Sequence, residues 1–163
     1  MLSQEAPDFA LRDQHGQVVR LSSFRGEKTV VVMFYPYAFS GVCTGELRAV
    51  RDHLPQLQSE HVALLAVSCD PMFSLRAFAE ADGLGFPLLS DFWPHGEVAS
   101  AYGVLDHDRG CPSRSTFIVD TTGTIRWSVH NARSEARDLA ELVRVLAGSR
   151  AEPTSRPGAR AAW

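Results

Sequence analysis

Two continuous apolar runs constrain the fold of this chain more than any other feature of its sequence. They cover residues 30–34 and 62–67, and they consist of aliphatic, β-branched and aromatic residues. A run without polar alternation predicts a strand buried on both faces, as in a parallel sheet covered by helices. Amphipathic segments follow at residues 41–57 and 72–82, where Pro55 is expected to kink or end the first helix. The alternation predicts an α/β fold with a central mixed sheet flanked by helices.

The remaining segments predict smaller elements around this sheet. Turn residues separate short apolar stretches near the N-terminus, which predicts a β-hairpin there, and Thr121–Thr124 predicts a second hairpin further along. Ser134 and Gly148 bound the last amphipathic segment as an N-cap and a stop. The predicted elements are a first hairpin over 6–11 and 17–21, a strand over 86–89, a helix over 95–102, a hairpin over 115–120 and 125–129, and a helix over 134–146.

Length and charge bound the organisation of the chain. Its 163 residues suit one domain, which we expect to span residues 1–148. Residues 149–163 are rich in Arg, Ala and Pro without periodicity, so we expect a disordered tail. A net charge of −3 gives no reason to expect nucleic acid or an anionic membrane as a partner. The apolar runs are too short to span a bilayer, and the N-terminus lacks a signal sequence, so we expect a cytoplasmic protein.

The three cysteines, Cys43, Cys69 and Cys111, do not form a recognised framework. They are widely spaced and odd in number, which argues against a disulfide-stapled fold. No Cys-x-x-Cys pair suggests a zinc site, and neither a dinucleotide-binding glycine signature nor a phosphate loop is present. We therefore expect no metal and no cofactor.

Cys43 differs from the other two cysteines in its place along the chain. It lies between the first apolar run and the helix-like segment, at the expected first turn of a helix, where free backbone N–H groups and the helix dipole favour a thiolate. Pro36 stiffens the preceding loop, and the Ser40 hydroxyl can donate to the sulfur or to a bound oxygen. The alternative is that Ser40 is only an N-cap and Pro36 only a turn residue. The arrangement suits nucleophilic attack on an electrophilic oxygen or sulfur.

The pattern Pro36-x-x-x-Ser40-x-x-Cys43 resembles the active-site motif of the peroxiredoxins, thiol peroxidases with a thioredoxin-like fold. The resemblance covers roughly residues 7–146, and within the family it is closest to the actinobacterial alkyl hydroperoxide reductase E type, classed as one-cysteine enzymes. Further segments carry it: Ala6-Pro-Asp-Phe9, Leu21-x-x-Phe-Arg-Gly26, Val67-Ser-Cys-Asp70, Phe86-Pro-Leu-Leu-Ser-Asp91, Ala101-Tyr-Gly-Val104 and Arg114-Ser-Thr-Phe-Ile-Val-Asp120.

The resemblance implies a role for each motif residue. Cys43 would attack a peroxide and become a sulfenic acid. Arg114 would stabilise the thiolate and hold the peroxide oxygens. Ser40 stands where the family usually has Thr, which keeps the hydroxyl. Glu46, although its position predicts a solvated helix residue, could orient Arg114 through an ion pair. No metal, haem or flavin is implied.

Two ways of reducing the sulfenic acid remain open. In the first, an external thiol acts, which by resemblance is mycothiol with a mycoredoxin, or thioredoxin. In the second, Cys111 is an internal resolving cysteine, as in an atypical two-cysteine enzyme, which requires Cα atoms within about 7 Å of each other. The position five residues after Cys43 is Arg48, so the variant with a cysteine there is excluded. Cys69 is interpreted as structural.

Other functions compete with the peroxidase. A thiol–disulfide oxidoreductase would need Cys-x-x-Cys, but Ser40 lies three residues before Cys43. A redox sensor or a purely structural module also fits the fold. The resemblance implies a homodimer, in which the aromatic-rich segment 92–95 could take part, although it could equally pack on its own domain. Phe34, Tyr37 and Phe39 offer an apolar approach suited to fatty-acid hydroperoxides, whereas hydrogen peroxide and peroxynitrite stay open as alternatives.

Overall fold

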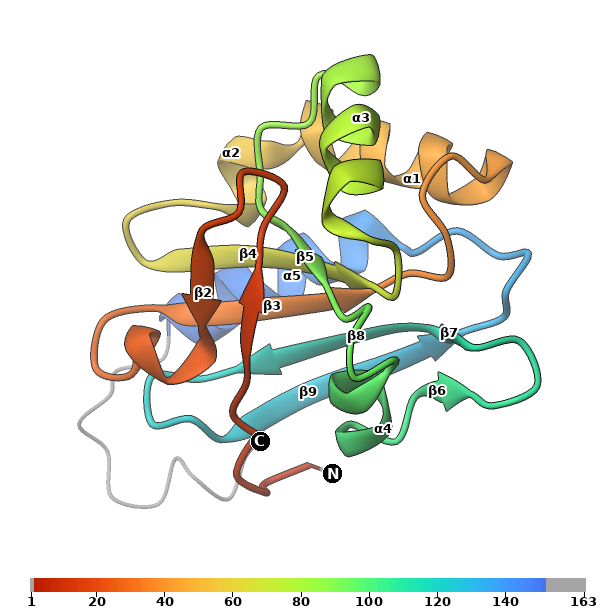
Figure 1. The fold of residues 1–163 in the computed structure, drawn as a ribbon. Helices are drawn as coiled ribbons and strands as arrows, with labels where there is room; N and C mark the ends of the chain where they lie inside the picture. The colour runs from red at the N-terminus through yellow and green to blue at the C-terminus, as the bar shows by residue number, and fades with distance from the viewer. Residues whose placement is uncertain (1, 152–163) are drawn as a thin grey trace.

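The computed structural model describes residues 2–151, and Figure 1 shows an α/β fold in which a central sheet is covered by helices. The elements are β1 Ala10–Arg12, β2 Val18–Arg20, a 3₁₀ helix η1 Leu21–Phe24, β3 Thr29–Phe34, α1 Gly41–Asp52, α2 Leu54–Leu57, β4 Val62–Ser68, α3 Met72–Asp82, β5 Leu88–Ser90, α4 Glu97–Ala101, β6 Leu105–Asp106, β7 Cys111–Pro112, β8 Arg114–Val119, β9 Ile125–Asn131 and α5 Leu139–Ala151. The predicted fold class is confirmed.

The central sheet is mixed and has the strand order β2-β1-β5-β4-β3-β8-β9. The two continuous apolar runs form β3 and β4, which pair in parallel at its middle. Strand β8 runs antiparallel to β3, and the predicted N-terminal hairpin pairs antiparallel with β5. Because parallel strands place their carboxyl ends at one edge, the chain leaves β3 and β4 on the same rim. That rim carries Cys43 and Cys69.

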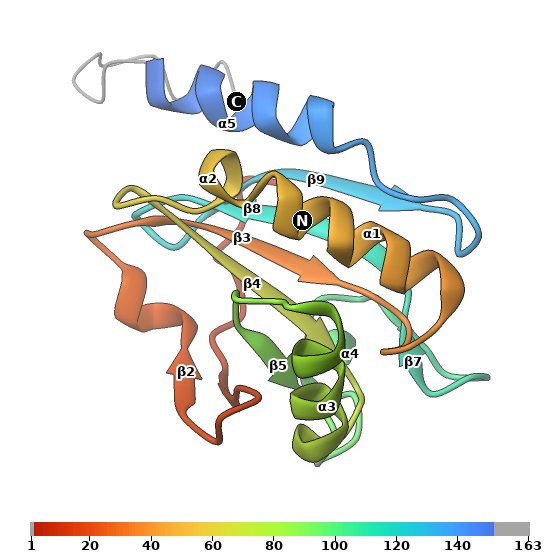
Figure 2. The same cartoon turned by 90° about the horizontal axis from the view of Figure 1, so that it is seen from above.

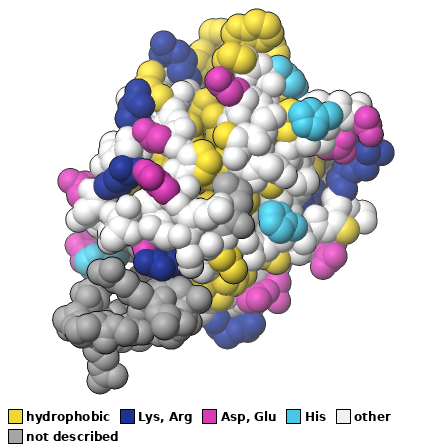
Figure 3. Space-filling model, turned by 90° about the horizontal axis from the view of Figure 1, so that it is seen from below, with side chains coloured by type: hydrophobic (Ala, Val, Ile, Leu, Met, Phe, Trp, Pro, Cys, Tyr) yellow, Lys and Arg dark blue, Asp and Glu magenta, His cyan; other side chains and the backbone are white. Residues whose placement is uncertain are grey.

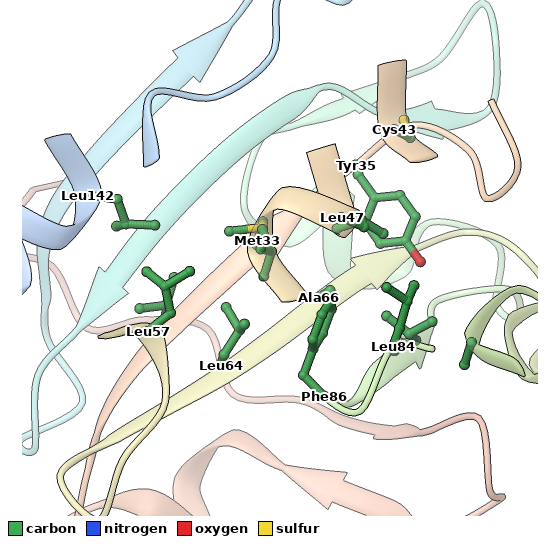
Figure 4. Packing of buried hydrophobic residues seen from close by; sticks show 14 of the residues in the cluster. Met33, Tyr35, Cys43, Leu47, Leu57, Leu64, Ala66, Leu84, Phe86 and Leu142 are labelled. Atoms are coloured by element: carbon green, nitrogen blue, oxygen red, sulfur yellow. The ribbon is translucent and has the colours of Figure 1, made fainter. Parts of the chain in front are cut away.

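The sheet separates two hydrophobic clusters, as expected for strands buried on both faces. Alternate residues of β3 face opposite sides, with Val31 and Met33 in one cluster and Val30 and Val32 in the other. Helices α1, α2, α3 and α5 cover the first face, and α4 with the N-terminal segment covers the second. Figure 4 shows Cys43 and Tyr35 at the edge of the first cluster, beyond Leu47 of α1. The nucleophile candidate therefore sits where the core meets the rim.

The segment 41–57 divides into α1 and α2 at His53, in agreement with the break expected at Pro55, which lies in the first turn of α2 and has no N–H to continue α1. The helix predicted over 95–102 is shorter and spans Glu97–Ala101. The last helix begins at Leu139 rather than Ser134, because the Asp138 carboxylate accepts from the Glu141 N–H and caps it. The helix continues through Gly148 to Ala151, so the predicted tail does not begin at residue 149. Residues 152–163 lie outside the described part of the chain.

The sequence contained no signal for the short β6–β7 ladder, in which Leu105 pairs with Pro112 and Asp106 with Cys111.

Within residues 2–151, no helix combines the length and apolarity needed to cross a membrane. The same residues hold no group of three or more His, Cys, Asp or Glu side chains suited to a metal ion. On the face shown in Figure 3, acidic, basic and histidine side chains are interspersed with hydrophobic ones.

Candidate active site

Cys43 lies in the first turn of α1, directly after the loop that leaves β3. Its side chain is fully buried. Ser40 occupies the N-cap position, but its side chain makes no capping bond. The N–H groups in the first turn of α1 therefore have no side-chain cap. The first backbone bond of the helix runs from the Thr44 N–H to the Ser40 carbonyl. Cys43 therefore lies at the positive end of the helix dipole, in the first turn that the sequence predicted for it.

The loop before Cys43 is held by two side chains from elsewhere in the chain, one after β4 and one in α3. The Ala38 N–H donates to Asp70 at 2.8 Å, and the same carboxylate accepts from the Ser68 hydroxyl at 2.7 Å. Phe39 has a positive φ of 67°, unusual for a bulky residue, and its ring lies 5.0 Å from that of Phe78 in α3. These contacts define the path of the loop into α1 and so fix the position of Cys43.

The Ser40 hydroxyl does not bond to Cys43 in this structure. It donates instead to the Tyr37 carbonyl at 3.1 Å, within the loop. Of the two roles predicted for this hydroxyl, the bond to the sulfur is not formed, because a local backbone carbonyl takes the proton, and donation to a bound oxygen stays a prediction. Pro36, at the start of this loop, is buried.

Arg114 contacts Cys43 directly, although 71 positions separate them in the sequence. Its Nη2 donates to the Cys43 Sγ at 3.2 Å and to the Arg133 carbonyl at 3.1 Å. The Arg114 side chain is 1% exposed. Strand β8 lies beside β3 in the sheet, and Arg114 stands at its start, next to the rim from which α1 begins. A buried guanidinium against a thiol favours the negatively charged sulfur.

Glu46 fixes the orientation of Arg114. Its Oε1 accepts from the Arg114 Nη1 at 2.6 Å, so the suggested ion pair is present. The residue is only 3% exposed, which corrects its predicted place on the solvated side of α1. Burial of this carboxylate is possible because two arginines surround it, and a buried charge requires such partners.

Arg137 is the second of these arginines and was not predicted from the sequence. Its backbone N–H donates to Glu46 Oε2 at 2.9 Å, and its Nη1 donates to Oε1 at 3.1 Å. Its Nη2 bonds to the Phe34 carbonyl at the end of β3. Burial lowers the pKa of Arg137 to about 10 despite the opposing effect of Glu46, so the group stays charged at neutral pH. No motif or residue spacing in the sequence indicates that Arg137 lies near Cys43.

The other two cysteines occupy a different environment. Burial, with the carboxylate of Asp91 as the next cause, raises the pKa of Cys69 to about 12. Cys111 is buried in β7 and interacts with the Tyr37 hydroxyl, which raises the pKa of Tyr37 to about 12. The same hydroxyl donates to the Arg109 carbonyl at 3.1 Å. Cys111 is therefore part of a paired strand rather than of a free loop.

A buried sulfur beside a guanidinium and a helix N-terminus can act as a nucleophile toward a weak oxygen–oxygen or sulfur–sulfur bond. Arg114 can at the same time receive the negative charge that develops on the leaving oxygen. The described residues offer this arrangement around Cys43, whereas Cys69 is buried near the carboxylates of Asp91 and Asp70.

Comparisons with known proteins agree with this chemistry. Residues 2–128 match the model of the AhpC/TSA family. The chain is 48% identical over 133 residues to alkyl hydroperoxide reductase E of Mycobacterium tuberculosis, covering 82% of this chain and 87% of the relative. It is 35% identical to the chloroplastic 2-Cys peroxiredoxin BAS1 of Spinacia oleracea, covering 90% of this chain and 58% of that protein.

Solved structures give the same result for the fold. Enterococcus faecalis AhpC superimposes with a TM-score of 0.82 at 32% identity, covering 91% of this chain and 92% of the other. Peroxidoxin BcpB of Mycobacterium tuberculosis superimposes with a TM-score of 0.78 at 30% identity, covering 94% and 98%. These neighbours have the thioredoxin-like fold predicted from the sequence.

Proposed function

Because this chain belongs to the AhpC/TSA family, the peroxiredoxins, and is a thiol-dependent peroxidase, we propose that Cys43 is its peroxidatic cysteine and that an external thiol reduces the oxidised form. The contact that carries the proposal is the 3.2 Å approach of Arg114 to the Cys43 sulfur, with Glu46 holding the guanidinium from its other side. Cys69 and Cys111 have no comparable pair of charged partners among the contacts of the described residues.

In the proposed first step, the Cys43 thiolate attacks the terminal oxygen of a hydroperoxide. The sulfur–oxygen bond forms as the oxygen–oxygen bond breaks, and the leaving alkoxide or hydroxide takes a proton to become an alcohol or water. Cys43 is left as a sulfenic acid, oxidised by two electrons. Arg114 stabilises the thiolate and the developing oxyanion, Glu46 positions Arg114, and Pro36 shapes the loop. The Ser40 hydroxyl is available to the peroxide if it exchanges its bond to the Tyr37 carbonyl.

In the proposed second step, an external thiol attacks the sulfenic sulfur. The burial of Cys111 and the pairing of its strand with β6 support an external thiol over Cys111, because an internal disulfide would require that ladder to open. The similarity to alkyl hydroperoxide reductase E supports the same choice. The reductant we propose is a mycothiol-type thiol with a mycoredoxin, or thioredoxin.

We further propose that the protein acts in the cytoplasm as a homodimer. Trp93 is 83% exposed and Phe92 is half exposed, which supports a role for segment 92–95 in the dimer interface. Tyr37 and Phe39 are exposed within the loop that leads to Cys43 and support a preference for organic hydroperoxides. Phe34, in β3, is fully buried in the cluster on the α4 face of the sheet, so it does not line that approach as the sequence suggested.

Intact mass after one equivalent of hydrogen peroxide tests the proposal, with Cys43→Ser and Cys111→Ser variants alongside. We expect a gain of one oxygen that requires Cys43 and persists in Cys111→Ser. A loss of two hydrogens that requires both cysteines would replace the external thiol with Cys111. If neither change occurs, Cys43 is not the peroxidatic cysteine. Repeated turnover with dithiothreitol then separates a peroxidase from a redox sensor, which is consumed once.

A further inference from the structure

Two consecutive residues of the loop before Cys43, Tyr37 and Ala38, are bound to different parts of the fold. The Ala38 N–H donates at 2.8 Å to the carboxylate of Asp70, two positions after the end of β4. The Tyr37 hydroxyl donates at 3.1 Å to the carbonyl of Arg109, in the turn between β6 and β7. Figure 2 shows β3 and β4 pointing toward the side of the molecule where β7 lies. The loop is therefore held from two sides at one point.

Asp70 is itself anchored to the rim of the central sheet. Its Oδ2 accepts from the Ser68 hydroxyl at 2.7 Å as well as from the Ala38 N–H. Ser68 is fully buried at the end of β4. The backbone carbonyl of Asp70 accepts at 2.7 Å from the hydroxyl of Ser90, the last residue of β5. Two neighbouring strands thus fix the orientation of the carboxylate, and it gives the loop a rigid point of attachment.

The turn that receives the Tyr37 hydroxyl is also held in place. The Gly110 carbonyl in this turn accepts from His95 Nε2 at 2.6 Å. Strands β6 and β7 pair on either side of the turn. Contact with the Cys111 thiol is the main cause that raises the pKa of Tyr37 to about 12, so the phenol keeps its proton at neutral pH and remains a donor. The second attachment of the loop is therefore made to a fixed turn as well.

The two attachments determine where the Ser40 hydroxyl and the first turn of α1 lie. The Ser40 hydroxyl donates to the Tyr37 carbonyl at 3.1 Å, so its direction depends on that peptide unit. The Thr44 N–H donates to the Ser40 carbonyl at 2.8 Å, which begins the backbone bonding of α1. Phe39 has a positive φ of 67°, a conformation that a bulky residue keeps only where the surrounding contacts impose it. A displacement of residues 37–38 therefore moves the hydroxyl and the start of α1 together.

From these contacts we propose that Asp70 and Tyr37 are positioning residues for the peroxidase reaction. They hold the loop so that the Ser40 hydroxyl and the Cys43 sulfur keep the arrangement in which the sulfur attacks a hydroperoxide. The inference rests on the proposed function, in which Cys43 is the nucleophile. Both residues act through the loop and not by contact with the peroxide. Their influence on the rate follows from geometry, because a misplacement of about 1 Å at a reacting group costs about 100-fold in rate.

Asp70 allows a sharp test, because both of its side-chain bonds end on the same oxygen. Asp70→Asn keeps an acceptor in that place, since the amide oxygen has two lone pairs for the Ala38 N–H and the Ser68 hydroxyl. Asp70→Ala has no acceptor. Both variants lose the negative charge, so the difference between them reports the hydrogen bonds. Asp120→Ala is the matched control, because the Asp120 carboxylate holds the backbone of the turn between β8 and β9, at the opposite end of β8 from the Cys43 site.

The test measures kcat/KM with hydrogen peroxide and the rate at which N-ethylmaleimide labels Cys43, followed by peptide mass spectrometry. Asp70→Ala should lower kcat/KM about tenfold relative to Asp70→Asn, because the loop loses its attachment to the rim. Labelling should change in the opposite direction and rise about tenfold, since Cys43 is fully buried and a bulky reagent reaches it only when the loop moves. Asp120→Ala should change neither rate. Tyr37→Phe loses one neutral bond and should lower kcat/KM about two- to fivefold.

Wild-type kcat/KM in Asp70→Ala, or an equal loss in Asp70→Asn, would overturn the positioning role of the Asp70 bonds. Wild-type kinetics in Tyr37→Phe would overturn the part assigned to the turn between β6 and β7. Cys43→Ser separates these outcomes from the proposed function. If Cys43→Ser is inactive while Asp70→Ala and Tyr37→Phe are normal, only the inference fails. If Cys43→Ser keeps its peroxidase activity, Cys43 is not the nucleophile, and the inference fails together with the proposed function.

Discussion

Cys43 and Cys69 occupy similar places in the fold and yet have opposite electrostatic surroundings. Each follows one of the two central parallel strands, on the same rim, and each is buried. Cys43 contacts Arg114 and lies in the first turn of α1, where the Ser40 side chain makes no capping bond. Cys69 faces Asp91 and Asp70, and burial together with these carboxylates raises its pKa to about 12. Burial alone therefore does not make a cysteine inert, nor does a place on the rim make it reactive. The sign of the neighbouring charge separates the two.

The largest expected effect comes from removing each sulfur in turn. Cys43→Ser should reduce kcat/KM with hydroperoxide by roughly 10⁴- to 10⁶-fold, the scale for loss of a catalytic nucleophile. Cys69→Ser should keep activity within a few-fold of the wild type, since its thiol is protonated at neutral pH. A coupled peroxidase assay measures both. Comparable losses in the two variants would remove the distinction between the two sites.

Arg114→Lys tests the positive side of the comparison. The guanidinium of Arg114 bonds to Glu46 and to Cys43 through two different nitrogens. Lysine keeps the positive charge but has a single nitrogen, which cannot reproduce this planar arrangement. We expect kcat/KM for hydroperoxide to fall about 10²- to 10³-fold. Arg48→Lys is the matched control, because Arg48 lies on α1, the helix that contains Cys43, but pairs with Asp82 and not with the sulfur. If both variants keep wild-type kinetics, Arg114 is only structural.

Glu46→Gln should act mainly through the two arginines that it pairs with. The amide can accept at one oxygen, whereas the carboxylate accepts three bonds from Arg114 and Arg137. Leaving buried charges unpaired costs about 3–5 kcal/mol of unfolding free energy, and misplacing Arg114 should lower kcat/KM about tenfold. Urea unfolding and peroxidase kinetics measure these effects. Glu135→Gln, at an exposed position, is the control, and a matching loss there would contradict the pairing.

The smallest predicted effect concerns Cys69. Asp91→Asn removes a nearby negative charge, so the Cys69 thiolate becomes less unfavourable and its pKa falls from about 12. The pKa stays above its ordinary value, because burial is the larger cause and remains. The Cβ chemical shift of Cys69, followed by NMR against pH, measures the change. A pKa that rises or does not move would show that Asp91 does not set the environment of this thiol.

The sequence predicted the parts of the site that are local along the chain. The apolar runs predicted β3 and β4, and the join after β3 predicted the place of Cys43 at a helix start. The motif resemblance supplied Arg114, which the structure brings to 3.2 Å from the sulfur. These features depend on patterns of a few neighbouring residues, or on an ordered set of motifs, and a single sequence contains both.

The parts that escaped prediction depend on distant partners. Glu46 has the spacing of an exposed helix residue, and its burial depends on Arg114 and Arg137, which lie 68 and 91 positions away. Arg137 itself was placed within the last helix, because nothing local indicates that residues 134–138 stay outside the helix, where the Arg137 N–H reaches Glu46. The sequence indicated that the Ser40 hydroxyl donates a hydrogen bond, but it did not indicate that the Tyr37 carbonyl is the acceptor.

The most direct measurement of the central claim is site-resolved trapping of sulfenic acid in the native protein. Substoichiometric hydrogen peroxide is added in the presence of a dimedone-type trap, and peptide mass spectrometry quantifies the adduct at all three cysteines. The charge environments predict an adduct at Cys43 and essentially none at Cys69 or Cys111. Comparable labelling at Cys69 would contradict the account, because neighbouring charge would then not decide which buried cysteine reacts.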